Sequence, residues 1–187
     1  MMKTVFIRYG YLLGICVEVL LFLFFFYTQE EINETFRYAA RYSGRLSLIV
    51  YLLSFSLFAK AYLKNESLED TQKALGVFAV LHLIHFVYLS GSIYLNAVPI
   101  VVVRLAGGFL AYLMIVLYPF FIKKIQRNIF HFIYFYYVGF VMIMTYIARV
   151  KGEFVGAKPE AFHYVGLVCL VLFLLFFGVR FITSKEK

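Results

Sequence analysis

The chain has 187 residues, of which 64% are apolar and only 15% are charged, against about 25% charged residues in a typical soluble domain. With a mean hydropathy of +0.87, this composition excludes a water-soluble globule, because a core of this size could not bury so much apolar surface. The net charge of +8 does not indicate nucleic-acid binding, since the basic residues stand in small groups between apolar runs. Cys16 and Cys169 lie isolated in such runs, which excludes a disulfide scaffold.

The first apolar run covers about residues 9–27 and follows Lys3 and Arg8, a charge arrangement that is also found in signal peptides. No small-residue cleavage site follows the run before the polar residues that begin at Thr28. The pattern therefore predicts an anchor helix that is retained.

The segment 28–44 separates this run from the next one. It opens with Thr28-x-x-Glu31, the spacing of a helix-capping box, and continues with apolar residues at helical spacing. Two interpretations stay open: a short helix that lies in the membrane interface, or a solvated loop whose basic end marks the next span.

Six apolar runs meet or nearly meet the length of about 20 residues that a helix needs to cross about 30 Å of hydrocarbon. They cover about residues 9–27, 46–63, 74–96, 98–122, 129–149 and 161–182. We therefore expect an all-α, polytopic membrane protein, in which residues 1–187 form a single transmembrane domain built as a six-helix bundle.

The basic residues divide unevenly between the two sides of such a bundle. Eleven of the 18 lie at the chain ends and in the 60–73 and 123–127 loops, whereas six lie on the opposite side and Arg104 lies inside the fourth run. By the positive-inside rule, both termini are expected in the cytoplasm.

Ionisable side chains at membrane depth are costly and usually face the interior of a bundle, so they are the first candidates for function. The predicted spans contain Glu18, His82, His85, Arg104 and His131, with His163 at the edge of the sixth span. All four histidines of the chain are in this set, and none lies in a polar loop.

His82 and His85 are three residues apart, which places both rings on one face of the third span. His131 opens the fifth span, which runs parallel to the third. The predicted helix boundaries place His82 and His131 about 7.5 Å apart in depth, at 1.5 Å per residue. This set therefore predicts facing imidazoles on two helices.

Two facing imidazoles are the ligand set of a low-spin haem iron, and hydrocarbon walls suit the porphyrin. The alternative is that the histidines hydrogen-bond across helices or to backbone carbonyls, a contact that contributes about 0.6 kcal/mol in membranes. Both interpretations stay open for this set. The Gly10-x-x-x-Gly14 spacing and the Gly107-Gly108 pair predict close approaches within the bundle, either by backbone or by a flat ligand.

Several stretches of the chain resemble the ferric reductase-like transmembrane family, which includes the NADPH oxidases and the haem-binding membrane subunit of the bacterial methionine sulfoxide reductase system. The similar stretches cover most of the chain from about residue 43: Ser43-Gly44-Arg45-Leu46-Ser47-Leu48, Leu75-Gly76, Pro119 and Phe130-His131-Phe132-Ile133-Tyr134.

The resemblance implies six spans and a noncovalent b-type haem, whose iron is bound by His131 together with His85 or His82. It thus implies electron transfer across or into the bilayer. Depth favours His82 as the partner of His131, whereas the family spacing of nine or ten residues after Gly76 favours His85, which we prefer.

The sequence departs from the family in the fifth span, where many members carry a second histidine thirteen residues after the first. Met144 stands at that position here, so a second haem would need another ligand, such as His163. No Gly-rich dinucleotide fingerprint is present, so a flavin is expected only on a separate partner chain.

Two rival functions use the same residues. The first is a non-haem metal-dependent intramembrane enzyme, for which Glu18 is the one carboxylate within a span. The second is a non-catalytic structural or assembly subunit of a membrane complex. The expected partners are the lipid bilayer and a separate electron donor protein or quinone, without nucleic acid; homo- and hetero-oligomers, and the identity of catalytic residues, stay open.

Overall fold

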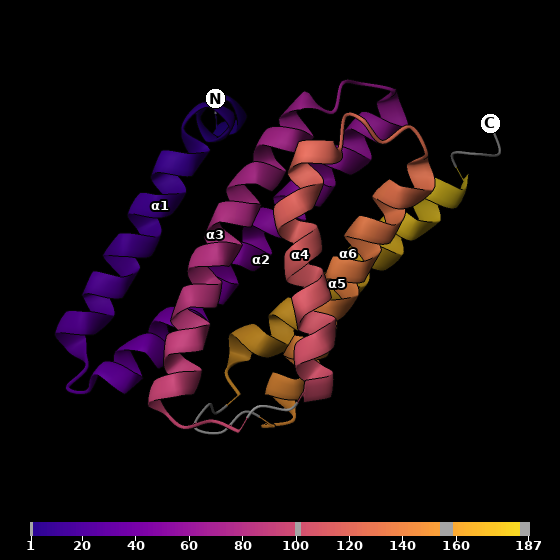
Figure 1. Cartoon of the computed structure of the whole chain (residues 1–187). Helices are drawn as coiled ribbons and strands as arrows, with labels where there is room; N and C mark the ends of the chain where they lie inside the picture. Colours follow the sequence, from indigo (N-terminus) through magenta and orange to yellow (C-terminus); the bar gives the residue numbers. More distant parts are fainter. Residues whose placement is uncertain (1, 100–101, 154–158, 184–187) are drawn as a thin grey trace.

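The computed structural model of the chain describes residues 2–99, 102–153 and 159–183. These residues form six α-helices and no strand (Figure 1). The helices are α1 (Met2–Thr28), α2 (Ile32–Lys64), α3 (Glu69–Leu95), α4 (Val102–Phe121), α5 (Asn128–Val150) and α6 (Ala161–Thr183). This confirms the predicted all-α architecture and the six predicted runs.

The helices run up and down in a bundle with short connections (Figure 1). Five of them are long and apolar enough to cross a membrane, and α4 is a shorter apolar helix over 106–121. Large apolar side chains of α1 and α6 are exposed, among them Leu20, Phe24, Leu172 and Leu175. Such a surface is compatible with a multi-pass integral membrane protein whose outer helices contact lipid.

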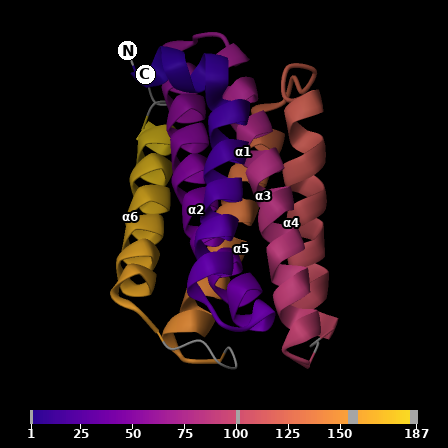
Figure 2. The same ribbon diagram turned by 90° about the vertical axis from the view of Figure 1, so that its left-hand side faces the viewer.

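The second helix lies at the centre of the bundle. It packs against α1, α3 and α6, and Figure 2 shows α1 in front of α2 and α3, with α5 behind them. Because α2 contacts several other helices, it can serve as a ruler along the bundle axis. Two residues on different helices lie at similar depth if they contact the same part of α2.

The segment 28–44 is neither a separate interfacial helix nor a solvated loop, so both interpretations of it were wrong. From Ile32 onward it is the first third of α2, a continuous helix of 33 residues. Thr35, Ala39 and Ala40 are buried there, and burial of this face against neighbouring helices favours continuing the helix. The capping box also does not form, because the Glu31 side chain makes no cap hydrogen bond and the Thr28 hydroxyl donates to the carbonyl of Phe24.

Aromatic side chains fill the core near the α2–α3 connection. Phe135 of α5 stacks on Phe55 and Phe58 of α2, with ring centroids 4.7 and 4.6 Å away. Tyr118 of α4 stacks on Tyr134 of α5 at 3.7 Å. Aromatic pairs at these separations add to the stability that burial alone provides, so this half of the bundle is closely packed.

The predicted close approach at Gly14 is present. A Cβ atom at Gly14 would lie 2.9 Å from Cδ2 of Leu81, so a larger residue would push α1 away from α3. Gly107 and Gly108 have no side chain or foreign backbone within 4 Å of such a Cβ atom. The missing side chains of the α4 pair therefore do not serve a close approach within the described residues, although the Gly107 carbonyl accepts a hydrogen bond of 3.1 Å from the Tyr137 hydroxyl of α5.

Candidate functional site

The His82–His85 pair lies together on α3, as its spacing predicts, with ring centroids 5.5 Å apart. The Nδ1 atoms of both rings are buried and have no hydrogen-bond partner. Tyr112 of α4 lies 4.5 Å from the His82 ring, and its hydroxyl is also buried without a partner. Each such group costs about 1–3 kcal/mol when it is left unsatisfied, so this site is the strongest candidate for a bound ligand.

The backbone of α2 forms the opposite wall of this site. The backbone of Ala40 lies near the His85 ring. A Cβ atom at Gly44 would lie 3.1 Å from Cε1 of His85, closer than ordinary van der Waals contact. The glycine of the Ser43-Gly44-Arg45 stretch is therefore what allows His85 to lie against α2.

His131 lies in a different environment, near the start of α5. Its Nδ1 atom hydrogen-bonds to the Tyr118 hydroxyl, and its ring lies 5.6 Å from the ring of Phe58. The ring also hydrogen-bonds to the backbone of Ile125. An open pocket of about 380 Å³ adjoins it, lined in part by Asn65. His131 is thus a buried, hydrogen-bonded histidine beside a polar pocket.

The two histidine sites lie at different depths. His85 contacts α2 at Gly44, whereas His131 contacts α2 at Phe58, and these 14 residues correspond to about 21 Å along the helix. Contacts of α4 give the same result. Tyr118 hydrogen-bonds to His131, and the carbonyl of the neighbouring Pro119 accepts a hydrogen bond from Gln72 of α3. His131 therefore lies near the depth of Gln72, which is 13 residues before His85 on the same helix.

The difference in depth is therefore about 20 Å for His85 and about 15 Å for His82, instead of the predicted 7.5 Å. The prediction failed because α3 begins at Glu69 and not at residue 74, and because helices cross at angles that a count of residues does not contain.

The implied haem ligation was tested against these positions. Metal–imidazole bonds are about 2 Å long, so two histidines separated by about 15–20 Å in depth do not fit as ligands of one iron. Met144, which lies nearer the depth of His85, is half exposed on the outside of α5 and does not complete the pair. Either ring of the His82–His85 pair could offer one imidazole nitrogen to a metal.

His163 lies at the start of α6 and caps that helix. Its Nδ1 atom accepts a hydrogen bond of 2.9 Å from the backbone N–H of Glu160, and its ring lies 6.2 Å from the ring of Tyr146. His163 is thus partnered, and the contacts of the described residues do not place it with the other histidines.

Glu18 is fully buried between α1 and α2. Its Oε1 atom accepts a hydrogen bond of 2.7 Å from the Ser43 hydroxyl, while Oε2 has no partner. The side chain of Arg104, the arginine of the fourth predicted span, lies outside the described residues. Over the described residues, no group of three or more His, Cys, Asp or Glu side chains is placed to hold a metal ion.

An arginine cluster at the end of the bundle is the feature that the sequence interpretation missed. Arg41 and Arg45 of α2 both form ion pairs with Glu160, which precedes α6. Burial raises the pKa of Glu160, but the hydrogen bond to Arg45 and the charges of Arg45 and Arg41 lower it more, so its pKa lies below the usual value. The signal was the i, i+4 arginine spacing, which was interpreted only as a sign of topology.

Comparison with known proteins adds no name to this site. No family model, no curated protein and no solved structure matches the chain. The functional argument therefore depends on the residues and their geometry alone.

Proposed function

We propose that the protein is the membrane subunit of an electron-transfer system and binds one b-type haem through the His82–His85 pair. The observation that supports this is the pair of buried Nδ1 atoms without partners among the described side chains. Neutral imidazole is the commonest protein ligand of haem iron, and the bound group would supply one-electron chemistry. Binding is noncovalent, since the sequence has no C-x-x-C-H motif.

The surrounding residues have separate roles in this proposal. The backbone of Ala40 lies beside the His85 ring, where a hydrogen bond from the ring would fix its orientation, as outer partners commonly do at metal ligands. The absent side chain at Gly44 leaves room for that ring. Tyr112 packs on His82 and has to turn aside to admit a planar group. His131 has a structural role, because its hydrogen bond to the Tyr118 hydroxyl links α5 to the aromatic core.

Electrons would enter from a separate donor protein, a flavin on another chain or a membrane quinone. A second metal-containing site near His131 is not needed for transfer into the bilayer. The protein would therefore be an oxidoreductase subunit that acts only together with a partner. It would lie within the lipid bilayer.

The experiment is a pyridine haemochrome assay on the purified protein and three variants. We expect haem in the wild type, loss of most of it in His85→Ala, and retention in His131→Ala. His82→Ala should retain haem with a shifted midpoint potential, because His82 lies beside the ligand. Haem loss in a folded His131→Ala variant would favour the family-like ligation instead, and a wild type without haem would overturn the proposal.

A second candidate function is a structural or assembly subunit. It is supported by His131 and His163, whose Nδ1 atoms both take part in hydrogen bonds within the fold, as packing histidines do. In that case the purified protein has no Soret band, and the His85→Ala variant changes only its thermal stability.

A further inference from the structure

The arginine cluster lies where α2, α5 and the start of α6 meet. Arg41 and Arg45 lie one turn apart on α2, and each forms an ion pair with a different carboxylate oxygen of Glu160. The Arg41 side chain is 10% exposed and that of Arg45 is 15% exposed, while that of Glu160 is 37% exposed. The cations are therefore buried more deeply than the anion that pairs with them.

A third guanidinium adds to this charge. Arg149 of α5 lies within electrostatic range of Arg41, Arg45 and Glu160. His163, at the start of α6, also lies within range of the three arginines. Arg41 and Arg45 thus share the one carboxylate of Glu160, with the charge of Arg149 within range of both. Like charges held this closely at low dielectric repel each other, so a further anion would stabilise the cluster.

The two α2 arginines also keep unused hydrogen-bond donors. The Nε atoms of Arg41 and Arg45 are buried and have no partner. The guanidinium of Arg45 lies 4.3 Å from the centroid of the Tyr42 ring and 4.9 Å from that of Phe162. Arg41 lies 5.1 Å from the Tyr38 ring. These rings hold the planar guanidinium groups in place, so the donors are ordered before any ligand binds.

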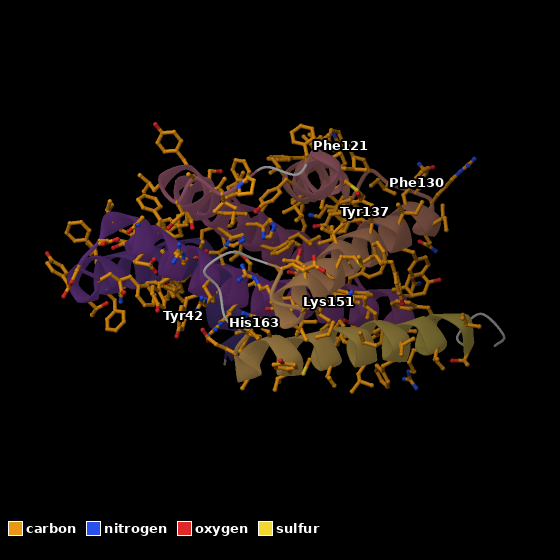
Figure 3. All side chains as sticks on the ribbon, turned by 90° about the horizontal axis from the view of Figure 1, so that it is seen from below. Tyr42, Phe121, Phe130, Tyr137, Lys151 and His163 are labelled. Atoms are coloured by element: carbon orange, nitrogen blue, oxygen red, sulfur yellow. The ribbon has the colours of Figure 1, made fainter. Side chains whose placement is uncertain are left out.

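Figure 3 looks onto this end of the bundle, with Tyr42, Lys151 and His163 labelled. The cluster lies close to the end of α5 and the start of α6, and therefore near the depth at which these helices would leave the hydrocarbon. Anionic groups at that depth belong to lipid headgroups or to solutes. The planar guanidinium group of arginine can donate two parallel hydrogen bonds to two oxygens of one phosphate group.

We propose that Arg41 and Arg45, within range of the charge of Arg149, form a binding site for a phosphate group, which takes a place beside or instead of the Glu160 carboxylate. Glu160 is the removable part of the site, because it is the most exposed member of the cluster and is attached to a connecting segment. The phosphate group comes from a lipid headgroup or from a free phosphate compound. Phosphate binding at this site does not require the proposed haem, although Arg45 follows Gly44, the α2 residue against which His85 lies.

The test measures phosphate binding by the full chain in an uncharged detergent. One arm titrates inorganic phosphate by calorimetry, and the other counts phosphatidylglycerol molecules that stay bound in native mass spectrometry. Arg41→Gln and Arg45→Gln should each weaken binding at least about tenfold, because each removes a charge-assisted hydrogen bond. Arg180→Gln, an exposed arginine of α6 outside the cluster, is the control and should bind as the wild type does.

Glu160→Gln separates this proposal from a merely structural ion pair. If the site binds phosphate, removal of the competing carboxylate strengthens binding, by about tenfold or more, even where the melting temperature falls. Binding in the lipid arm alone identifies a headgroup site, and binding in the phosphate arm alone identifies a solute site. Absence of binding in both arms by a folded wild type, or unchanged binding in a folded Arg41→Gln, Arg45→Gln double variant, would overturn the proposal.

Discussion

Gly44 has a role that depends on its missing side chain. It lets the His85 ring lie against the backbone of α2, and a Cβ atom there would come within 3.1 Å of that ring. A single methyl group at this position is therefore expected to move the histidine or the helix.

Gly44→Ala should destabilise the protein by about 1–3 kcal/mol, the usual range for overpacking a close-packed site. The measurement is thermal or denaturant unfolding in detergent. Gly108→Ala is the matched control, because nothing lies within 4 Å of its Cβ position and alanine stabilises a helix relative to glycine. Equal stability of the two variants would show that His85 does not contact α2 at Gly44.

The pH dependence of stability should report the ion pairs of Glu160. Because its pKa is lowered in the folded protein, the pairs stabilise the fold above the ordinary carboxyl pKa, and this contribution is lost as the pH falls through the folded pKa. The melting temperature of the wild type should thus fall between about pH 5 and pH 3 more than that of Glu160→Gln. Parallel curves for the two proteins would mean that the carboxylate is not paired.

For single residues, the sequence was enough to select the four histidines and Glu18 as candidates for function, but it did not predict which residues they contact. The i, i+3 spacing placed His82 and His85 together, because helical geometry fixes that relation. The Tyr118–His131 bond and the Arg45–Glu160 pair join residues on different elements, and their contact depends on helix rotation and crossing. Counting residues along the sequence does not give the rotation or the crossing angle of a helix.

Helix α2 decides much of the arrangement at the scale of elements. Its 33 residues span about 50 Å, whereas the hydrocarbon is about 30 Å thick. The helix therefore tilts, extends beyond the hydrocarbon or does both, and its first turns carry the packing contacts at Ala39 and Ala40. The sequence interpretation divided this helix because its polar first third does not resemble a membrane span.

A proline scan tests whether α2 is continuous. Ala39→Pro should cost about 3 kcal/mol or more, because it removes a hydrogen bond inside the helix and clashes with the preceding turn. Ile32→Pro is the control, since Ile32 is the first helical residue after the extended Glu31, a position that accepts proline. The readouts are helicity by circular dichroism and melting temperature. Equal tolerance of both prolines would indicate that the segment 32–44 is not part of one packed helix.

The number of helices and their order were predictable at the scale of the whole molecule. Length and hydropathy mark each apolar run, so each of the six helices contains most of one predicted run, although α1, α2 and α3 begin at Met2, Ile32 and Glu69, before the predicted starts. The relative depth of His85 and His131 was not predictable, because it depends on helix crossings.

An even number of up-and-down helices places the described start of α1 and the described end of α6 at the same end of the bundle (Figure 1). Reporter fusions after Lys187 and at Gly152 should therefore report opposite sides of the membrane, with the Lys187 fusion cytoplasmic by the positive-inside rule. A fusion at Asn65 is the control and should agree with Lys187. The same side for Lys187 and Gly152 would contradict the six-helix arrangement.

The stacked rings of Tyr118 and Tyr134 give the protein an optical signature of its own. The chain has 16 Tyr residues and no Trp, so tyrosine dominates its near-ultraviolet absorption. Two tyrosine rings with centroids 3.7 Å apart, in planes inclined by 8°, couple their electronic transitions only while α4 and α5 are docked. Near-ultraviolet dichroism thus reports the assembly of this half of the bundle, separately from the helix content that the far-ultraviolet signal records.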